Sequence, residues 1–232
     1  MGNNVGYRGR RSKTPDIALP TLKNKNWCKI YTALFVDESL NDSGAAVFCN
    51  GMYQPQLNAE GIDTGLALTN PVSAAQIQKI IQYDKWITSL IEQFSPEVVV
   101  GESHPFARGS LKTSNATLEV MTGIRYVTML ACGKLNVPYV EFSTNHVKTI
   151  MCGGPSATKE MVQLILTGCG YKLPEYATKR GVVNGNVCDA IAMGEVISRM
   201  QKIEILRSEY LESTGGGRTQ TKKRRSLPSP MS

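Results

Sequence analysis

The stretch LFVDESLNDSGAAVF, residues 34–48, joins two apolar runs through a short polar segment. The first run begins near Cys28 and ends at Asp37, and the second covers residues 44–49 before the pair Asn50-Gly51. Short apolar runs bounded by turn residues are typical of buried strands, and Asn-Gly favours a tight hairpin turn. The stretch therefore predicts two neighbouring strands, with a polar loop and a carboxylate between them.

The rest of the chain alternates between strand and helix patterns. Three further strands are expected at residues 52–57, 97–101 and 137–142. Apolar residues at helical spacing predict helices at residues 74–94, 114–135, 145–151, 156–167 and 187–211. A hairpin followed by strand–helix alternation predicts an α/β domain, with a mixed five-stranded sheet covered by helices on both faces.

Composition limits the class of protein. The chain has 232 residues, of which 41% are hydrophobic, enough for one domain with a sizeable core. It has no apolar run that could span a membrane and no secretory signal pattern at its start. The six cysteines form no C-x-x-C pair. We therefore expect reduced thiols, no zinc, and a cytoplasmic, nucleoid-associated protein of a bacterial or virus-infected cell.

Charge is concentrated at the two ends. Residues 1–26 and 213–232 each carry a net charge of +5, whereas residues 27–212 carry −3. The ends are rich in small and polar residues, so we expect two basic arms around a folded domain at 27–212. Such arms commonly bind nucleic acid without sequence preference. The alternative is that they only increase solubility or are remnants of cloning.

Three carboxylates stand out by position. Asp37 and Glu102 each end a predicted strand, and Asp189 shares the sheet-facing side of the last helix with Ala192 and Met193. Buried carboxylates need a compensating charge, and carboxylate oxygens suit Mg²⁺ or Mn²⁺. Two such ions can assist displacement at a phosphodiester. Taken singly, each carboxylate could equally be a solvated turn or loop residue.

Four segments in collinear order, between about residues 30 and 200, resemble RuvC-type Holliday junction resolvases. They are LFVDESLNDSGAAVF, VVVGESHPFARGSLKTSNATLEVMTGIRYV, VPYVEFSTNHVKTIMCGGPSATKEMVQLIL and NVCDAIAMGEVI. The resemblance implies an RNase H-like fold, a homodimer, and Mg²⁺-dependent nicking of opposed strands at a four-way DNA junction. It assigns the catalytic and metal-binding roles to Asp37, Glu102 and Asp189, and DNA contacts to Lys148 and Lys159. No small-molecule cofactor and no membrane partner is implied.

The sequence departs from the family pattern at Asn186 and after Glu102, and the two basic ends have no counterpart in that pattern. Asn186 replaces the acidic residue or histidine three positions before the terminal aspartate, so it would ligate a second ion only through an amide oxygen. Phe106 lies four rather than three residues after Glu102, and it is either a stacking wedge in the opened junction or a core residue. Arg108 and Lys112, in the same segment, could follow a DNA strand or form a charged loop face.

Two other functions remain open at this stage. The chain could be an RNase H-like nuclease acting on RNA or other branched nucleic acids, or a junction-binding protein weakened catalytically by Asn186. For the dimer, we expect the helix at 114–135 to offer Val120, Ile124 and Val127 to a partner, unless this stripe packs on its own sheet. Glu195, six residues after Asp189, is expected to face solvent.

Overall fold

A mixed β-sheet forms the centre of the computed structural model, which describes residues 17–23, 25–39, 42–54, 61–63, 74–103, 115–173 and 185–213. Five strands lie in the order β3-β2-β1-β5-β6, and the short strand β4 pairs with β2 beside this path. The strands are β1 Thr32–Asp37, β2 Asp42–Cys49, β3 Met52–Tyr53, β4 Gly61–Asp63, β5 Val98–Glu102 and β6 Tyr139–Phe142. The predicted sheet is thus confirmed, with β4 as an addition.

The directions of the strands bring together the two strand ends that carry predicted catalytic carboxylates. Strands β1 and β2 are antiparallel, whereas β5 and β6 run parallel to β1. Asn50 and Gly51 both have positive φ, as a tight turn from β2 to β3 requires. The register pairs Val36 with Gly101 in the parallel ladder, so Asp37 and Glu102 end adjacent strands at the same edge of the sheet.

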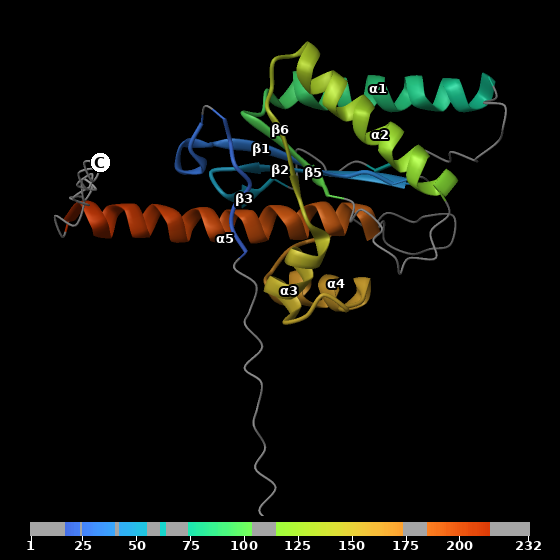
Figure 1. The fold of residues 1–232 in the computed structure, drawn as a ribbon. Helices are drawn as coiled ribbons and strands as arrows, with labels where there is room; N and C mark the ends of the chain where they lie inside the picture. Colours follow the sequence, from blue (N-terminus) through green and yellow to red (C-terminus); the bar gives the residue numbers. More distant parts are fainter. Residues whose placement is uncertain are drawn as a thin grey trace, which may run out of the picture.

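Helices cover both faces of the sheet (Figure 1). Helices α1 (Ala74–Phe94) and α2 (Asn115–Lys134) lie on one face, and the long helix α5 (Gly185–Ser213) lies on the other. Helices α3 (Thr144–Cys152) and α4 (Lys159–Gly168) pack against α5. The helices expected from apolar periodicity are therefore all present. The expected strand start at Cys28 is wrong, because Trp27–Lys29 form a short 3-10 helix, η1.

Alternation along β1 divides the core into two layers. Ala33 and Phe35 pack on the α5 side, whereas Leu34 and Val36 pack on the α1–α2 side. The same alternation continues past the end of the strand, so Asp37 belongs to the α5 side and Glu38 to the opposite side. Adjacent carboxyl groups thereby enter two different environments.

Two expectations about the domain's outer parts change with the structure. Three apolar residues of the expected N-terminal arm pack against the α5-side core, which extends the folded unit to include Ile17, Leu19 and Leu22. On α2, Ile124 is buried and Val127 is half-buried against the core beneath α1 and α2, so this stripe packs mainly on its own sheet. The side chain of Val120 lies outside the described part of the structure. None of the described helices is long and apolar enough to cross a membrane.

Gly44 fixes the distance between α5 and the sheet. A Cβ atom at this residue would lie 2.3 Å from the Val187 backbone nitrogen and 2.4 Å from the Asn186 carbonyl carbon. Only glycine permits this approach of a helix N-terminus to β2. Because Gly44 is also the ladder partner of Asp37, the contact brings the first turns of α5, and hence Asp189, next to the end of β1.

We expect Gly44→Ala to displace the start of α5 and to lower the free energy of unfolding by about 1–3 kcal/mol through overpacking. The matched control is Gly133→Ala in α2, where a Cβ would meet nothing within 4 Å. That change should leave stability unchanged or raise it by up to about 1 kcal/mol. Urea denaturation of both variants checks the difference. Equal stabilities would contradict the importance of the Gly44 contact.

Candidate active site

Asp37 and Glu102 meet at the ends of β1 and β5. The Asp37 side chain is buried, and its carboxyl group hydrogen-bonds with that of Glu102. The Thr144 hydroxyl, in the first turn of α3, donates a hydrogen bond to Glu102 Oε1. The parallel register thus creates the carboxyl pair, and α3 holds one member of it.

Asp189 completes the cluster from α5. Its carboxylate lies 2.9 Å from the Lys159 ammonium at the start of α4. The same ammonium donates a hydrogen bond of 2.8 Å to Asn186 Oδ1. The Asn186 amide nitrogen in turn donates to the Asp42 carbonyl oxygen on β2. Asn186 therefore joins α4, α5 and the sheet at the edge of the carboxylate cluster.

The cluster holds more negative charge than its surroundings balance. Burial raises the pKa of Asp37 well above its ordinary value, and the neighbouring charges of Glu102 and Asp189 raise it further. Burial also raises the pKa of Asp189, although Lys159 opposes this effect. For Lys159, burial acts to lower the pKa, but the carboxylates around it produce a net rise. Without an added cation, the cluster therefore favours bound protons.

This donor set fits a hard divalent cation. Carboxylate and amide oxygens are the ligands that Mg²⁺ and Mn²⁺ prefer, and an added positive charge would relieve the repulsion that raises the Asp37 pKa. Within the described residues, no three His, Cys, Asp or Glu side chains already stand in a ligating group. Asp189, the third carboxylate of the cluster, is instead engaged by the Lys159 ammonium.

The structure locates only some of the other predicted contact residues. Lys148 on α3 lies close enough for its charge to favour ionised Asp189, so both predicted lysines are beside the cluster. Phe106, Arg108 and Lys112 lie outside the described residues, and nothing in the structure tests their predicted contacts. Thr144 was not singled out from the sequence, where only its place directly after a strand could have suggested a helix-start residue near the site.

Glu38 is a second buried carboxyl group that sequence reasoning missed. It lies on the α1–α2 side of the sheet, where the Tyr139 hydroxyl donates to Glu38 Oε1 at 3.3 Å. Thr128 also hydrogen-bonds to it, and Thr128 in turn lies 2.9 Å from the Tyr83 hydroxyl oxygen. Burial raises the pKa of Glu38 to about 8, against the opposing effect of these hydrogen bonds. Glu38 is therefore mostly protonated at neutral pH.

The expectation that Glu195 faces solvent is wrong. The side chain is only 14% exposed, and the Tyr171 hydroxyl donates to its Oε2. Arg199 Nε lies 2.5 Å from Glu195 Oε1. The segment that follows α4 folds over this side of α5, which the helical periodicity of α5 could not reveal.

Sequence comparisons find relatives of one kind. No family model matches the chain. The crossover junction endodeoxyribonuclease RuvC of Dehalococcoides mccartyi is 30% identical over 97 residues, which cover 42% of this chain and 55% of that protein. The RuvC of Thermomicrobium roseum is 28% identical over 130 residues, which cover 54% of this chain and 76% of that protein. The match thus spans only about half the length of the first relative.

Solved structures agree with these sequence matches. T. thermophilus RuvC in complex with a Holliday junction substrate superposes with a TM-score of 0.52 and 18% identity, over 75% of this chain and 96% of that one. The yeast mitochondrial Holliday junction resolvase Ydc2 gives a TM-score of 0.51 and 12% identity, over 78% and 83% of the two chains. The chain therefore has the RNase H-like fold of the RuvC-type resolvases. Both the predicted fold class and the resemblance to this family are confirmed.

The raised pKa of Glu38 predicts a particular dependence of stability on pH. The folded state holds this proton up to about pH 8, whereas an unfolded Glu releases it near its ordinary value of 4.5. Stability is therefore lost as the pH rises between these values, at up to about 1.4 kcal/mol per pH unit. Glu38→Gln keeps the neutral shape and should flatten the slope of unfolding free energy against pH.

The control for this measurement is Glu92→Gln, at an exposed position on α1, which should leave the slope unchanged. Both variants are compared with the original chain by urea denaturation in the presence of a chelator. A Glu38→Gln slope as steep as that of the original chain would show that Glu38 is already ionised in the folded protein.

Proposed function

We propose that this chain is a divalent-metal-dependent endonuclease that resolves four-way DNA junctions by nicking opposed strands. The observation that carries the proposal is the convergence of Asp37, Glu102 and Asp189 from two strand ends and one helix, with an excess of negative charge. The RuvC relatives and the fold support the same activity. The substrate follows from the relatives, and the chemistry follows from the cluster.

In this proposal each residue of the cluster has a separate role. Asp37, Glu102 and Asp189 would hold up to two Mg²⁺ ions, for which Mn²⁺ would substitute, and Asn186 would contribute an amide oxygen. Ions held there would supply Lewis-acid stabilisation of the charge that develops at a phosphodiester during hydrolysis. Lys159 balances Asp189 in the protein alone, and with Lys148 it contacts a phosphate of the bound strand. Thr144 positions Glu102 through its hydroxyl group.

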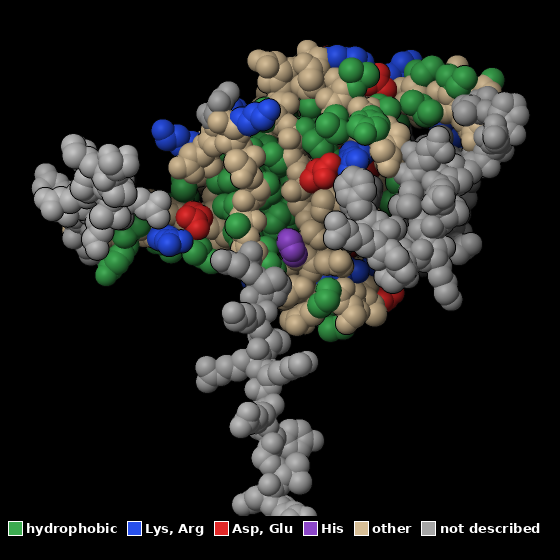
Figure 2. All heavy atoms as spheres, in the orientation of Figure 1, with side chains coloured by type: hydrophobic (Ala, Val, Ile, Leu, Met, Phe, Trp, Pro, Cys, Tyr) green, Lys and Arg blue, Asp and Glu red, His purple; other side chains and the backbone are tan. Residues whose placement is uncertain are grey.

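A dimer is supported by an exposed apolar surface on the face of the sheet opposite α5. Hydrophobic side chains gather over α1 and α2 (Figure 2). The residues that form this apolar surface, each between 38% and 58% exposed, are Ile77, Ile80, Ile81, Tyr126, Met129 and Leu130. We propose that a second copy of the chain covers it, so that two active sites face a two-fold symmetric substrate.

The remaining expectations complete the proposal. The basic segments at 1–16 and 214–232 lie outside the described residues, and we propose that they contact phosphates without reading bases. We place the protein with cellular DNA in the nucleoid. Cutting of RNA or of flaps in preference to junctions would favour the wider nuclease alternative. Binding of junctions without cutting would favour the catalytically weakened protein, in which Asn186 stays engaged by Lys159.

We expect Asp37→Asn, Glu102→Gln and Asp189→Asn each to slow junction cutting by on the order of a thousandfold, since several kcal/mol of charge stabilisation is lost. Junction affinity should change little, because each substitution keeps the shape of the side chain. Glu92→Gln, exposed on α1, is the control and should cut normally. The assay follows labelled four-way junctions, flaps and RNA duplexes with Mg²⁺ or Mn²⁺. Any variant that cuts at the original rate removes its residue from the proposed site.

The proposed dimer is tested at Leu130, which is 56% exposed. We expect the original chain to sediment as a dimer at micromolar concentration and Leu130→Lys to sediment as a monomer. The control is Leu206→Lys, at a residue 64% exposed on the far end of α5, which should stay dimeric. A monomeric original chain, with and without junction DNA, would contradict the proposal.

A further inference from the structure

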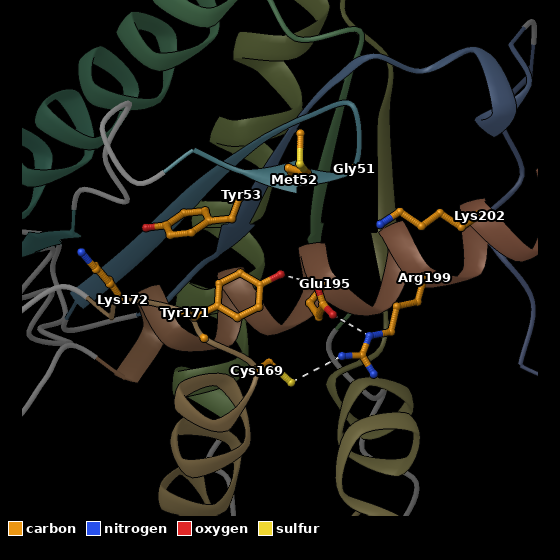
Figure 3. Close-up of a pocket in the computed structure, with 10 residues that line it drawn as sticks. Gly51, Met52, Tyr53, Cys169, Tyr171, Lys172, Glu195, Arg199 and Lys202 are labelled. Carbon is orange, nitrogen blue, oxygen red and sulfur yellow. Dashed lines mark hydrogen bonds and ion pairs between the residues drawn. The ribbon is translucent and has the colours of Figure 1, made fainter.

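A pocket of about 690 Å³ lies on the α5 side of the fold, apart from the carboxylate cluster. It opens between the turn that precedes β3, the segment that follows α4, and the middle of α5 (Figure 3). Pockets of this size commonly hold ligands of nucleotide scale. None of the residues assigned above to catalysis lines it.

The pocket wall is basic. Lys172 and Lys202 are exposed and stand toward opposite ends of the pocket, with Arg199 between them on α5 (Figure 3). Among the described residues that line it, Glu195 is the only acidic one, and it is already paired with Arg199. Within the described residues, neither lysine forms an ion pair, so the pocket carries two cations without acidic partners. This arrangement favours an extended anion with more than one negative group.

The pocket also offers aromatic surface. The rings of Tyr53 and Tyr171 lie 5.9 Å apart and are tilted by 42°. Both side chains are half-buried, and the Tyr171 hydroxyl is held by Glu195, so this ring is fixed in orientation. Fixed aromatic faces beside lysines are the usual means by which proteins hold sugars and bases of a nucleic-acid strand.

Helix α4 connects the pocket with the carboxylate cluster. It begins at Lys159, whose ammonium contacts Asp189. Just past the end of α4, the sulfur of Cys169 accepts a hydrogen bond of 3.5 Å from Arg199 Nη2. On α5, Asp189 and Arg199 are ten residues apart, or about 15 Å along the helix axis. A strand that leaves the carboxylate cluster could therefore reach the pocket within a few nucleotides.

We propose that this pocket binds the phosphate backbone of a DNA strand outside the cutting site. Lys172 and Lys202 each contact a phosphate. The rings of Tyr53 and Tyr171 contact the sugar or base that lies between these two phosphates. The pocket gives the folded unit, whose net charge is negative, a local anchor for a junction arm. The inference rests on the proposed function only in that DNA is the substrate.

Salt dependence of binding gives the first test. Each phosphate contact contributes about 0.9 to the slope of log affinity against log salt for duplex DNA, and about 0.7 for a single strand. The double variant Lys172→Gln/Lys202→Gln should therefore bind junctions with a slope shallower by about 1.4 to 1.8. The matched control is Lys85→Gln, at an exposed lysine of α1 on the opposite face. A double variant with the slope of the original chain would overturn the proposal.

Alkylation of Cys169 gives a second test. This thiol is exposed and lines the pocket, whereas Cys28, half-buried in η1, is a reference outside it. Saturating junction DNA should slow iodoacetamide modification of Cys169 several-fold relative to Cys28, as followed by mass spectrometry. The double lysine variant, saturated with the same junction, should lose this protection. Protection that persists in the variant would show that DNA covers Cys169 without using the pocket, which contradicts the proposal.

Two further ligands in the alkylation experiment, a junction with short arms and a mononucleotide, identify the source of the phosphate. Protection by junctions with long arms, but not by junctions with short arms or by a mononucleotide, supports an arm of the substrate. Protection by the mononucleotide alone would overturn the proposal in favour of a free-nucleotide site. Junction cutting by the original chain is measured separately. If the chain cuts junctions but the pocket variants bind as the original does, only the pocket proposal fails; if it cuts no junction, the proposed function fails.

Discussion

Helix α5 reaches the sheet at Gly44 because this residue has no side chain, and the position of the cluster depends on that contact. The approach of Asn186 and Val187 to β2 brings Asp189 beside the ladder partner of Gly44, which is Asp37. The parallel pairing of β1 with β5 adds Glu102 from the other side. Three distant parts of the chain therefore meet through one close backbone contact and one strand register.

These three carboxylates lie close together and repel one another, and the metal binding of the proposed function would relieve this repulsion. Burial and mutual repulsion raise the pKa of Asp37, and a single direct ion pair from Lys159 does not balance the cluster. Glu38, one residue away, is also buried, but it keeps its proton and forms hydrogen bonds with Tyr139 and Thr128. Strand alternation alone separates these two outcomes. One carboxyl group stays neutral in a core, and its neighbour joins the cluster with excess negative charge, which is the proposed metal site.

Sequence patterns predicted the elements well because apolar periodicity follows burial directly. They also placed Asp37, Glu102 and Asp189 on elements that meet, since strand ends and a sheet-facing helix position are local properties. The role of Glu38 was not predictable, because its environment comes from Tyr139, 101 residues away. The burial of Glu195 was not predicted for the same reason, because the segment that follows α4 covers this side of α5. Of the third predicted strand, Met52–Tyr53 pair with β2 and Gln54 does not continue the strand, whereas residues 55–57 lie outside the described part of the chain. The three-residue β4 is too short to leave a sequence pattern.

The most direct test of the account is whether the carboxylate cluster binds a divalent cation in exchange for protons. Mn²⁺ binding to the protein without DNA can be followed by calorimetry in buffers with different ionisation enthalpies. We predict that binding releases protons, weakens as the pH falls, and loses at least about tenfold in affinity in Asp37→Asn and Asp189→Asn, since an ion gains more from a carboxylate than from an amide. Equal Mn²⁺ affinity in the original chain and both variants, with no proton release, would contradict the account.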